Sequence, residues 1–150
     1  AGHDADAAGA WQTAISDGAG LPQVYDWLSQ ALLRTRSLRE AGDILEEAVD
    51  KWPDDPRFTR PLAMLYALFG KGHEAVRMLE RYLTARQDDG EAYRMGVDWI
   101  YHAHAAGGVI YNREDDLKFA HEYADAYTKI RGAQTALVQQ WLEFLDKEKR

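Results

Sequence analysis

The sequence predicts an all-α fold, a solenoid of stacked helical hairpins, on three observations. The chain repeats itself every 34 residues, so that Glu40-Ala41 recurs as Glu74-Ala75. Apolar positions keep the same register, since Leu45 falls on Leu79. Only four prolines interrupt the 150 residues. A fixed period of about 20–50 residues is typical of helical repeats, in which each unit buries its apolar face against the next one.

Two complete units span residues 22–55 and 56–89. Their matching residues are Ala41, Leu45, Ala48 and Pro53 in the first unit and Leu62-Ala63, Tyr66, Gly70, Ala75 and Leu79 in the second. These residues resemble the tetratricopeptide repeat (TPR) family in type and spacing. Departures from the family pattern are Ser29, Arg36, Tyr82 and Gln87. The resemblance implies a right-handed α-solenoid that binds a peptide or partner domain in a concave groove.

The turn residues of these units agree with the helix boundaries that the resemblance implies. Pro22 and Pro56 fit a first helical turn, where the missing N–H costs nothing. Gly70 stands where the first helix of its unit must stop, and it supplies the backbone conformation that turns the chain. Small residues such as Ala63 and Ala75 would let neighbouring helices approach closely.

The segment before the first unit looks like half of a repeat. Ala7, Trp11 and Ala14 precede Ala41, Leu45 and Ala48 by one period. Residues 5–17 are therefore expected to form the second helix of a preceding unit, which would make the chain a C-terminal piece of a longer protein. The alternative is a short N-terminal capping helix.

The third unit, residues 90–132, is enlarged. Its first helix is expected from Glu91 to about Ala106, but Ala120 follows Ala75 by 45 residues instead of 34, so eleven residues are inserted. Asn112 with the three acids after it predicts the start of a helix. The apolar triplet at 109–111, within the 107–113 insertion, would then either contact a ligand from a loop or fold back over the repeat core.

A final helix is expected over residues 133–148. Leu137, Trp141 and Leu145 form an apolar stripe along it, and the tail is wholly charged. A solenoid needs such a helix to cover the apolar face of its last repeat, so we interpret it as a cap. The alternative is a dimerisation helix.

Composition excludes several classes of function. The net charge of -7 argues against nucleic-acid binding, which needs a basic surface. No apolar run approaches the about 20 residues that span a bilayer. The absence of cysteine removes disulfides, thiolate catalysis and cysteine zinc sites, and it suits either a reducing or an oxidising compartment.

The resemblance also implies where a ligand binds, because first helices line the groove of the family. The positions carried over to this chain are Arg34, Arg57, Arg60, Met64, Leu68, Arg94, Asp98, Tyr101 and His102. The four arginines would offer fork-shaped donors to the carboxylates of an acidic peptide. The alternative is that Asp26, Glu91 and Asp98 pair with these arginines across neighbouring helices.

A protein-interaction module is therefore the predicted function, with no cofactor and no enzymatic activity. The alternative is a structural solenoid that packs against another domain of a longer parent chain or forms a homodimer. A weaker alternative is a metal-dependent enzyme at His102. However, His102 and His104 lie two residues apart and point to different sides of a helix, so no metal site is predicted. Histidines at the surface or in the groove are the expectation, and no catalytic motif is present.

Overall fold

The computed structural model describes residues 2–16, 20–132 and 135–148 of the chain. Throughout these residues the secondary structure consists of helices and the turns between them, without a strand, which confirms the predicted all-α class. The chain divides into two compact units, residues 1–65 and 66–150. Within its described part, no helix combines the length and hydrophobicity that a membrane span requires.

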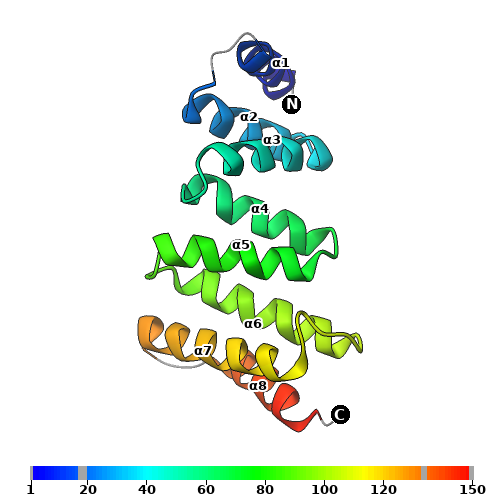
Figure 1. Cartoon of the computed structure of the whole chain (residues 1–150), viewed down its shortest axis with the longest axis vertical. Helices are drawn as coiled ribbons and strands as arrows, with labels where there is room; N and C mark the ends of the chain where they lie inside the picture. The colour runs from blue at the N-terminus through cyan, green and yellow to red at the C-terminus, as the bar shows by residue number, and fades with distance from the viewer. Residues whose placement is uncertain (1, 17–19, 133–134, 149–150) are drawn as a thin grey trace. The chain divides into compact units, whose positions relative to one another are not determined.

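Unit 1 contains α1 (Gly2–Ser16), α2 (Pro22–Arg34), α3 (Leu38–Lys51) and most of α4 (Pro56–Leu68) (Figure 1). Helix α2 contacts both α1 and α3. Its buried residues recur three or four positions apart, as on one face of an amphipathic helix, and α3 does the same. The buried apolar residues of these two helices are Tyr25, Leu28, Ala31, Leu32, Ala41, Ile44, Leu45, Ala48 and Val49.

Pro22 and Pro56 both occupy the first position of their helices, as the sequence predicts. Between α3 and α4, Trp52 packs its ring edge-on against Tyr25, at 5.3 Å between ring centroids, and lies 5.8 Å from the ring of Phe58. Phe58 is fully buried. This aromatic cluster connects α2, the end of α3 and the start of α4, so it holds the first repeat against the next helix.

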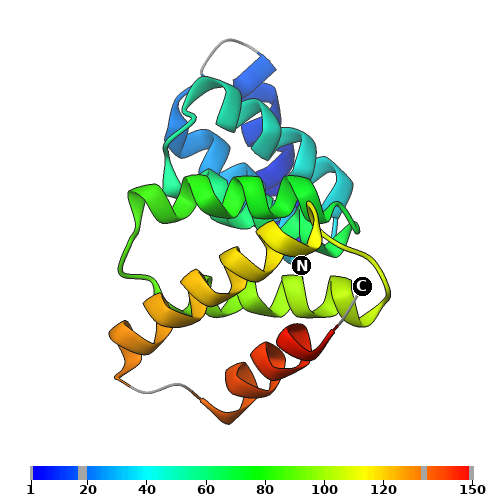
Figure 2. The ribbon, with the colours of Figure 1, turned by 60° about the horizontal axis from the view of Figure 1, so that its bottom comes forward.

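Unit 2 contains the end of α4, then α5 (Gly72–Ala85), α6 (Gly90–Ala105), α7 (Arg113–Arg131) and α8 (Ala136–Lys147). Helix α6 is central to this unit, because it contacts α5, α7 and α8 (Figure 2). Helices α7 and α8 also contact each other. The first helix of the third repeat is thus enclosed on three sides.

Side-chain caps mark the starts of the last three helices. Asp89, Asn112 and Thr135 each accept a hydrogen bond from a backbone N–H of the first turn. The predicted helix start at Asn112 is confirmed. The final helix begins at Ala136 instead of Ala133, because Thr135 is the residue that caps it. Residue 17 and residues 133–134, which the sequence analysis placed in helices, lie outside the described residues.

Equivalent turns close the first helices of the repeats. Arg36, Gly70 and Gly107 all have a positive φ, of 64°, 78° and 88°. In each turn the next residue donates its N–H to a carbonyl five positions earlier, which is the pattern of a Schellman motif. Arg36, noted above as a departure from the family pattern, therefore adopts a left-handed conformation that normally favours glycine.

Gly96 allows a close helix contact in unit 2. It stands one period after Leu62 and two after Leu28, where the earlier repeats have a buried leucine. A Cβ atom at Gly96 would lie only 2.5 Å from Cδ2 of Tyr123 on α7. The ring of Tyr123 therefore fills the space that a leucine side chain of the first helix fills in the earlier repeats.

Candidate functional site

The predicted groove residues of unit 1 are engaged with near neighbours. Arg57 donates to Asp55 through Nε, at 3.1 Å from Oδ1, and through Nη2, at 2.7 Å from Oδ2. This hydrogen-bonded ion pair lowers the pKa of Asp55. Arg60 donates from Nη1 to Sδ of Met64 at 3.5 Å, and Arg34 lies in the last turn of α2. The guanidinium group of Arg57 is thus already bound to the carboxylate of Asp55.

The predicted residues on α6 are also paired. Arg94 donates to both carboxylate oxygens of Glu91, at 2.6 Å from Nε and 2.9 Å from Nη2. His102 Nδ1 lies 2.6 Å from Asp98 Oδ1. Both pairs form within one helix, one turn apart, rather than across neighbouring helices. Tyr101 turns toward α8, which places it among aromatic side chains instead of at an open surface.

An aromatic cluster joins α6 to α8. The ring of Tyr101 stacks on Trp141 at 5.8 Å between centroids and meets Phe144 edge-on at 5.2 Å. Trp141 is buried, whereas Phe144 is 40% exposed. Helix α8 thereby covers one side of α6, which agrees with a capping role.

An apolar pocket in unit 2 includes one of the predicted groove positions, His102. We call it the insertion pocket; its volume is about 280 Å³ and its lining residues are Ala67, Gly70, Gly72, Ala75, Trp99, His102, Ala103 and Ile110. These come from the α4–α5 turn, from α6 and from the 107–113 insertion. Leu68, Phe69 and Val109, in or next to these segments, are 66%, 44% and 51% exposed. Such a concentration of exposed apolar side chains is typical of an interaction site.

The insertion is a loop that folds back onto the start of α5. Cδ1 of Ile110 would lie 2.8 Å from a Cβ at Gly72, so the absence of a side chain there admits Ile110. Tyr111 packs edge-on against His73, at 4.3 Å between centroids, and against Phe119 on α7. Val109 stays exposed. Two members of the triplet thus cover the repeat core, while the third is free to contact a ligand.

A buried carboxylate fixes this loop. Asp116 on α7 is fully buried, and its Oδ2 accepts from the backbone N–H of Ile110 at 2.7 Å. Its Oδ1 accepts from the N–H of Tyr111 at 2.9 Å. His104 Nε2 lies 2.8 Å from Oδ2. Three donors therefore compensate the buried charge and hold the wall of the insertion pocket in place.

His104 links three helices, and the expectation that the helical histidines lie at the surface or in the groove is wrong for it. The residue is only 3% exposed, because α7 and α8 both cover it. Its Nδ1 lies 2.5 Å from Glu148 Oε1, just after α8, opposite the contact with Asp116. Arg113 donates to the backbone oxygen of Leu145 at 3.4 Å and to that of Glu148. The sequence offered no signal for this network, because its members lie far apart along the chain.

His121 makes a separate exposed pair with Asp146, at 2.8 Å between Nε2 and Oδ1. The carboxylates around His104 face opposite ring nitrogens and do not converge on one point. Among the residues that the structure describes, no group of three or more histidine and acidic side chains has the arrangement of a metal site. The contacts of His104 and His121 with carboxylates link the helices of unit 2 to one another.

Comparison with known proteins identifies the repeats. Residues 32–99 match the family model described as tetratricopeptide repeat. A search of the curated proteins gave no match. TPR units are non-enzymatic helical hairpins that generally mediate protein–protein interactions. The match thus supports a helical-repeat domain of the tetratricopeptide repeat type over residues 32–99.

Proposed function

We propose that this chain is a protein-interaction module and that its partner inserts apolar side chains into the insertion pocket. The observation that carries the proposal is the lining of that pocket. It combines His102, a predicted groove position, with Ile110 of the insertion. The degenerate third repeat would thereby gain a binding surface that the regular repeats lack.

The size and surroundings of the pocket favour a protein ligand. Its volume of about 280 Å³ is just below the about 300–1,000 Å³ of typical small-molecule sites. The exposed Leu68 and Val109 extend the apolar surface beyond the cavity, and the His102–Asp98 pair gives it a polar margin. An apolar centre with a polar rim is the usual anatomy of a protein interface.

The loop wall supports tight binding because it is already ordered. The buried Asp116 carboxylate holds the N–H groups of Ile110 and Tyr111, so the loop backbone is fixed before a ligand arrives. A partner would not bear the entropic cost of ordering that segment. The anchored loop thus favours the pocket over the exposed apolar faces elsewhere in unit 2.

The experiment compares two equally exposed leucines as bait variants. Leu68 is 66% exposed beside the pocket and Leu21, before α2, is 64% exposed. We expect wild type and Leu21→Glu to recover the same partner from an extract of the native host. Leu68→Glu should recover about tenfold less, because a charge would be buried in the interface. Equal recovery by Leu68→Glu and Leu21→Glu would place the site elsewhere.

The groove positions in unit 1 stay a prediction, and the same assay tests them. Arg57→Glu and Arg60→Glu reverse two of the charges proposed to attract an acidic ligand. Because Arg57 already holds Asp55, we expect its substitution to change recovery less than Leu68→Glu does. A partner lost with the arginine variants but kept with Leu68→Glu would move the site to these basic residues.

One observation favours self-association as a second candidate. Leu137 and Phe144 on α8 are 48% and 40% exposed, although Phe144 also contacts Tyr101 of α6. Exposed apolar side chains on a terminal helix suit a homodimer contact. Light scattering of wild type beside Leu137→Glu tests this alternative. A dimer that the substitution converts to a monomer would support it, and a monomeric wild type would reject it.

A further inference from the structure

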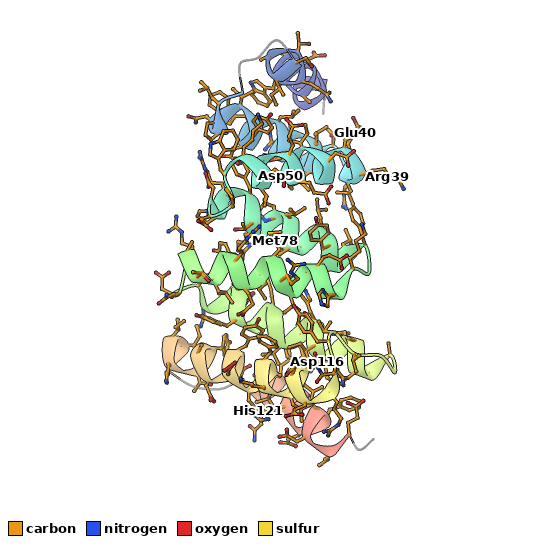
Figure 3. The ribbon with its side chains drawn as sticks, viewed as in Figure 1. Arg39, Glu40, Asp50, Met78, Asp116 and His121 are labelled. Atoms are coloured by element: carbon orange, nitrogen blue, oxygen red, sulfur yellow. The ribbon has the colours of Figure 1, made fainter. Side chains whose placement is uncertain are left out.

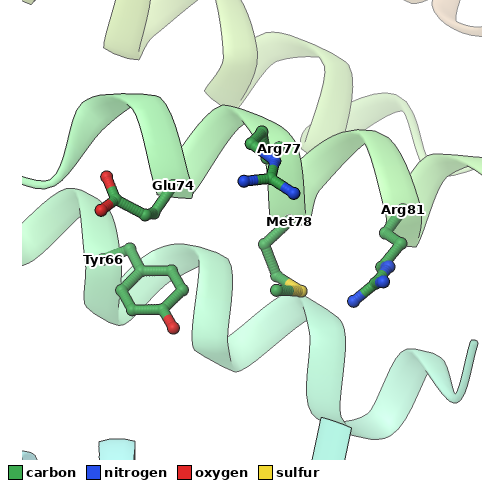
Figure 4. Close-up of a pocket in the computed structure, with 5 residues that line it drawn as sticks. All are labelled: Tyr66, Glu74, Arg77, Met78 and Arg81. Carbon is green, nitrogen blue, oxygen red and sulfur yellow. The ribbon is translucent and has the colours of Figure 1, made fainter. Parts of the chain in front are cut away.

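A second cavity lies on the surface of α5. Its volume is about 180 Å³, and its lining residues are Tyr66, Glu74, Arg77, Met78 and Arg81. No residue lines both cavities. In Figure 4, Arg77 and Met78 lie between Glu74 at one end and Arg81 at the other. We call this cavity the arginine pocket.

The two guanidinium groups of the arginine pocket are available to a ligand. Arg77 and Arg81 are four residues apart on one helix, so they lie on the same face. Both are exposed. Among the described residues neither forms a hydrogen bond or an ion pair, although the charge of Arg77 acts on Tyr111. They differ in this from Arg57 and Arg94, whose forks hold carboxylates of their own chain.

The remaining lining residues define what else the ligand carries. Met78 and the ring of Tyr66 give the cavity an apolar wall. Glu74 gives the opposite end a negative charge. A ligand that matches all three features has an acidic group, an apolar side chain and, at the far end, a cation or an N–H donor.

The spacing of these features fits a short extended peptide. Glu74 and Arg81 are seven residues apart along α5, which corresponds to about 10 Å along the helix axis. An extended chain covers that length in about three residues. The carboxylate and the cation of the ligand should therefore stand about three positions apart, with the apolar residue between them.

We propose that the arginine pocket binds an acidic peptide segment of a protein partner, with its Asp or Glu side chain held by Arg77 and Arg81. Charge complementarity selects this ligand. Glu74 and the net charge of -7 repel a dianionic phosphate or a nucleic acid more strongly than a single carboxylate. The site is separate from the insertion pocket, so it does not depend on the function proposed there.

The test is selection from a random seven-residue peptide display library. The baits are wild type, the double variant Arg77→Gln/Arg81→Gln, and Arg39→Gln as a control. Arg39 is an exposed arginine on α3 (labelled in Figure 3), and it too forms no ion pair within the described part of the chain. The three arginines are exposed on their helices, so circular dichroism should report unchanged folding for each bait.

We expect wild type and Arg39→Gln to enrich peptides with Asp or Glu about three positions from Lys or Arg. The double variant should not enrich them, and a synthesised consensus peptide should bind it at least about tenfold more weakly. Equal enrichment by the double variant, no acidic consensus, or displacement of the peptide by inorganic phosphate would each overturn the proposal. The Leu68→Glu variant should bind the consensus peptide like wild type.

Discussion

The α2–α3 hairpin of unit 1 and the α6–α7 hairpin of unit 2 share the turn that ends their first helix, but they differ in the connection that follows it. Both first helices close with the same backbone pattern, at Arg36 and at Gly107. In unit 1 the next helix starts two residues later, at Leu38, and Leu28 is buried in α2. In unit 2 a loop intervenes, and Gly96 gives its space to Tyr123.

The difference teaches how a repeat can acquire a loop without losing its core. The close approach at Gly96 lets α7 supply the aromatic side chain that fills the repeat interior. Asp116 then bonds the backbone of the inserted loop, so the extra residues are tied to the helix that follows them. The loop becomes one wall of the insertion pocket. The α2–α3 connection of unit 1 is a short turn and forms no such wall.

The largest predicted effect is the loss of the Asp116 anchor. Asp116→Ala should destabilise unit 2 by about 3–5 kcal/mol, because it removes the partner of the buried His104 Nε2 and of the N–H groups of Ile110 and Tyr111. Urea denaturation followed by circular dichroism measures the change. The exposed Asp125 on the same helix is the control, and Asp125→Ala should shift the midpoint little. Similar effects of the two substitutions would contradict the anchor.

Next in size is the effect of restoring a side chain at Gly96. Gly96→Ala should cost about 1–3 kcal/mol, because its Cβ would lie 2.5 Å from the ring of Tyr123. Gly9→Ala in α1, where no atom lies within 4 Å, should instead be neutral or stabilising. In a double-mutant cycle, Tyr123→Leu should make Gly96→Ala less costly. If the free-energy changes of the two substitutions simply add, residues 96 and 123 do not compete for the same space.

Alkaline pH should weaken both hairpins through their buried tyrosines. In unit 1, burial and the hydrogen bond to Glu47 raise the pKa of Tyr25 to about 12 from 10.0. In unit 2, burial and the bond to Glu80 raise the pKa of Tyr123 further. Since both pKa values are raised on folding, this stability is complete below pH 10 and is lost as pH rises above it.

For Tyr25 the loss amounts to about 1.4 kcal/mol at about pH 11. Denaturation curves at pH 8 and pH 11 measure it, with Tyr25→Phe as the comparison. The variant should lose less stability than wild type over this interval, since it has no hydroxyl to ionise. An identical loss in both proteins would assign the alkaline effect to other groups.

The smallest effects concern the shared turn. Arg36→Gly should stabilise unit 1 by about 0.5 kcal/mol, because glycine adopts a φ of 64° without the steric cost that arginine bears. Gly70→Ala, at a φ of 78°, should destabilise by about 1 kcal/mol. Thermal denaturation of both variants tests these opposite signs. A loss of stability for Arg36→Gly would mean that its side chain contributes more than its backbone strain costs.

Much of the fold followed from local patterns. Pro22, Pro56 and Asn112 marked helix starts, since these residues act through the backbone of their own turn. The close contact at Gly96 was not predicted, although the two earlier repeats have leucine at that position. The sequence did not show that the ring of Tyr123 fills the space of this leucine, because the insertion shifts the repeat register of α7.

The site was less predictable because its key contacts link distant positions. Asp116 reads in the sequence as one of three acids in a first helical turn, and only the folded loop brings two backbone N–H groups to it. His104 reads as a surface residue until α8 covers it. Similarly, the partners of Arg57 and Arg94 are two and three residues away, and residue type alone does not distinguish them from arginines left free for a ligand.

The most direct test of the insertion pocket as a binding site is site-specific photo-crosslinking. The photoreactive amino acid benzoylphenylalanine would replace Val109, which is exposed on the loop, or Leu21, which is exposed in unit 1. After capture of the partner from the native host's extract and irradiation, mass spectrometry identifies the crosslinked peptides. We predict crosslinks from position 109 and none from position 21. A partner that is captured but crosslinks from position 21, or from neither position, would contradict the insertion pocket as the binding site.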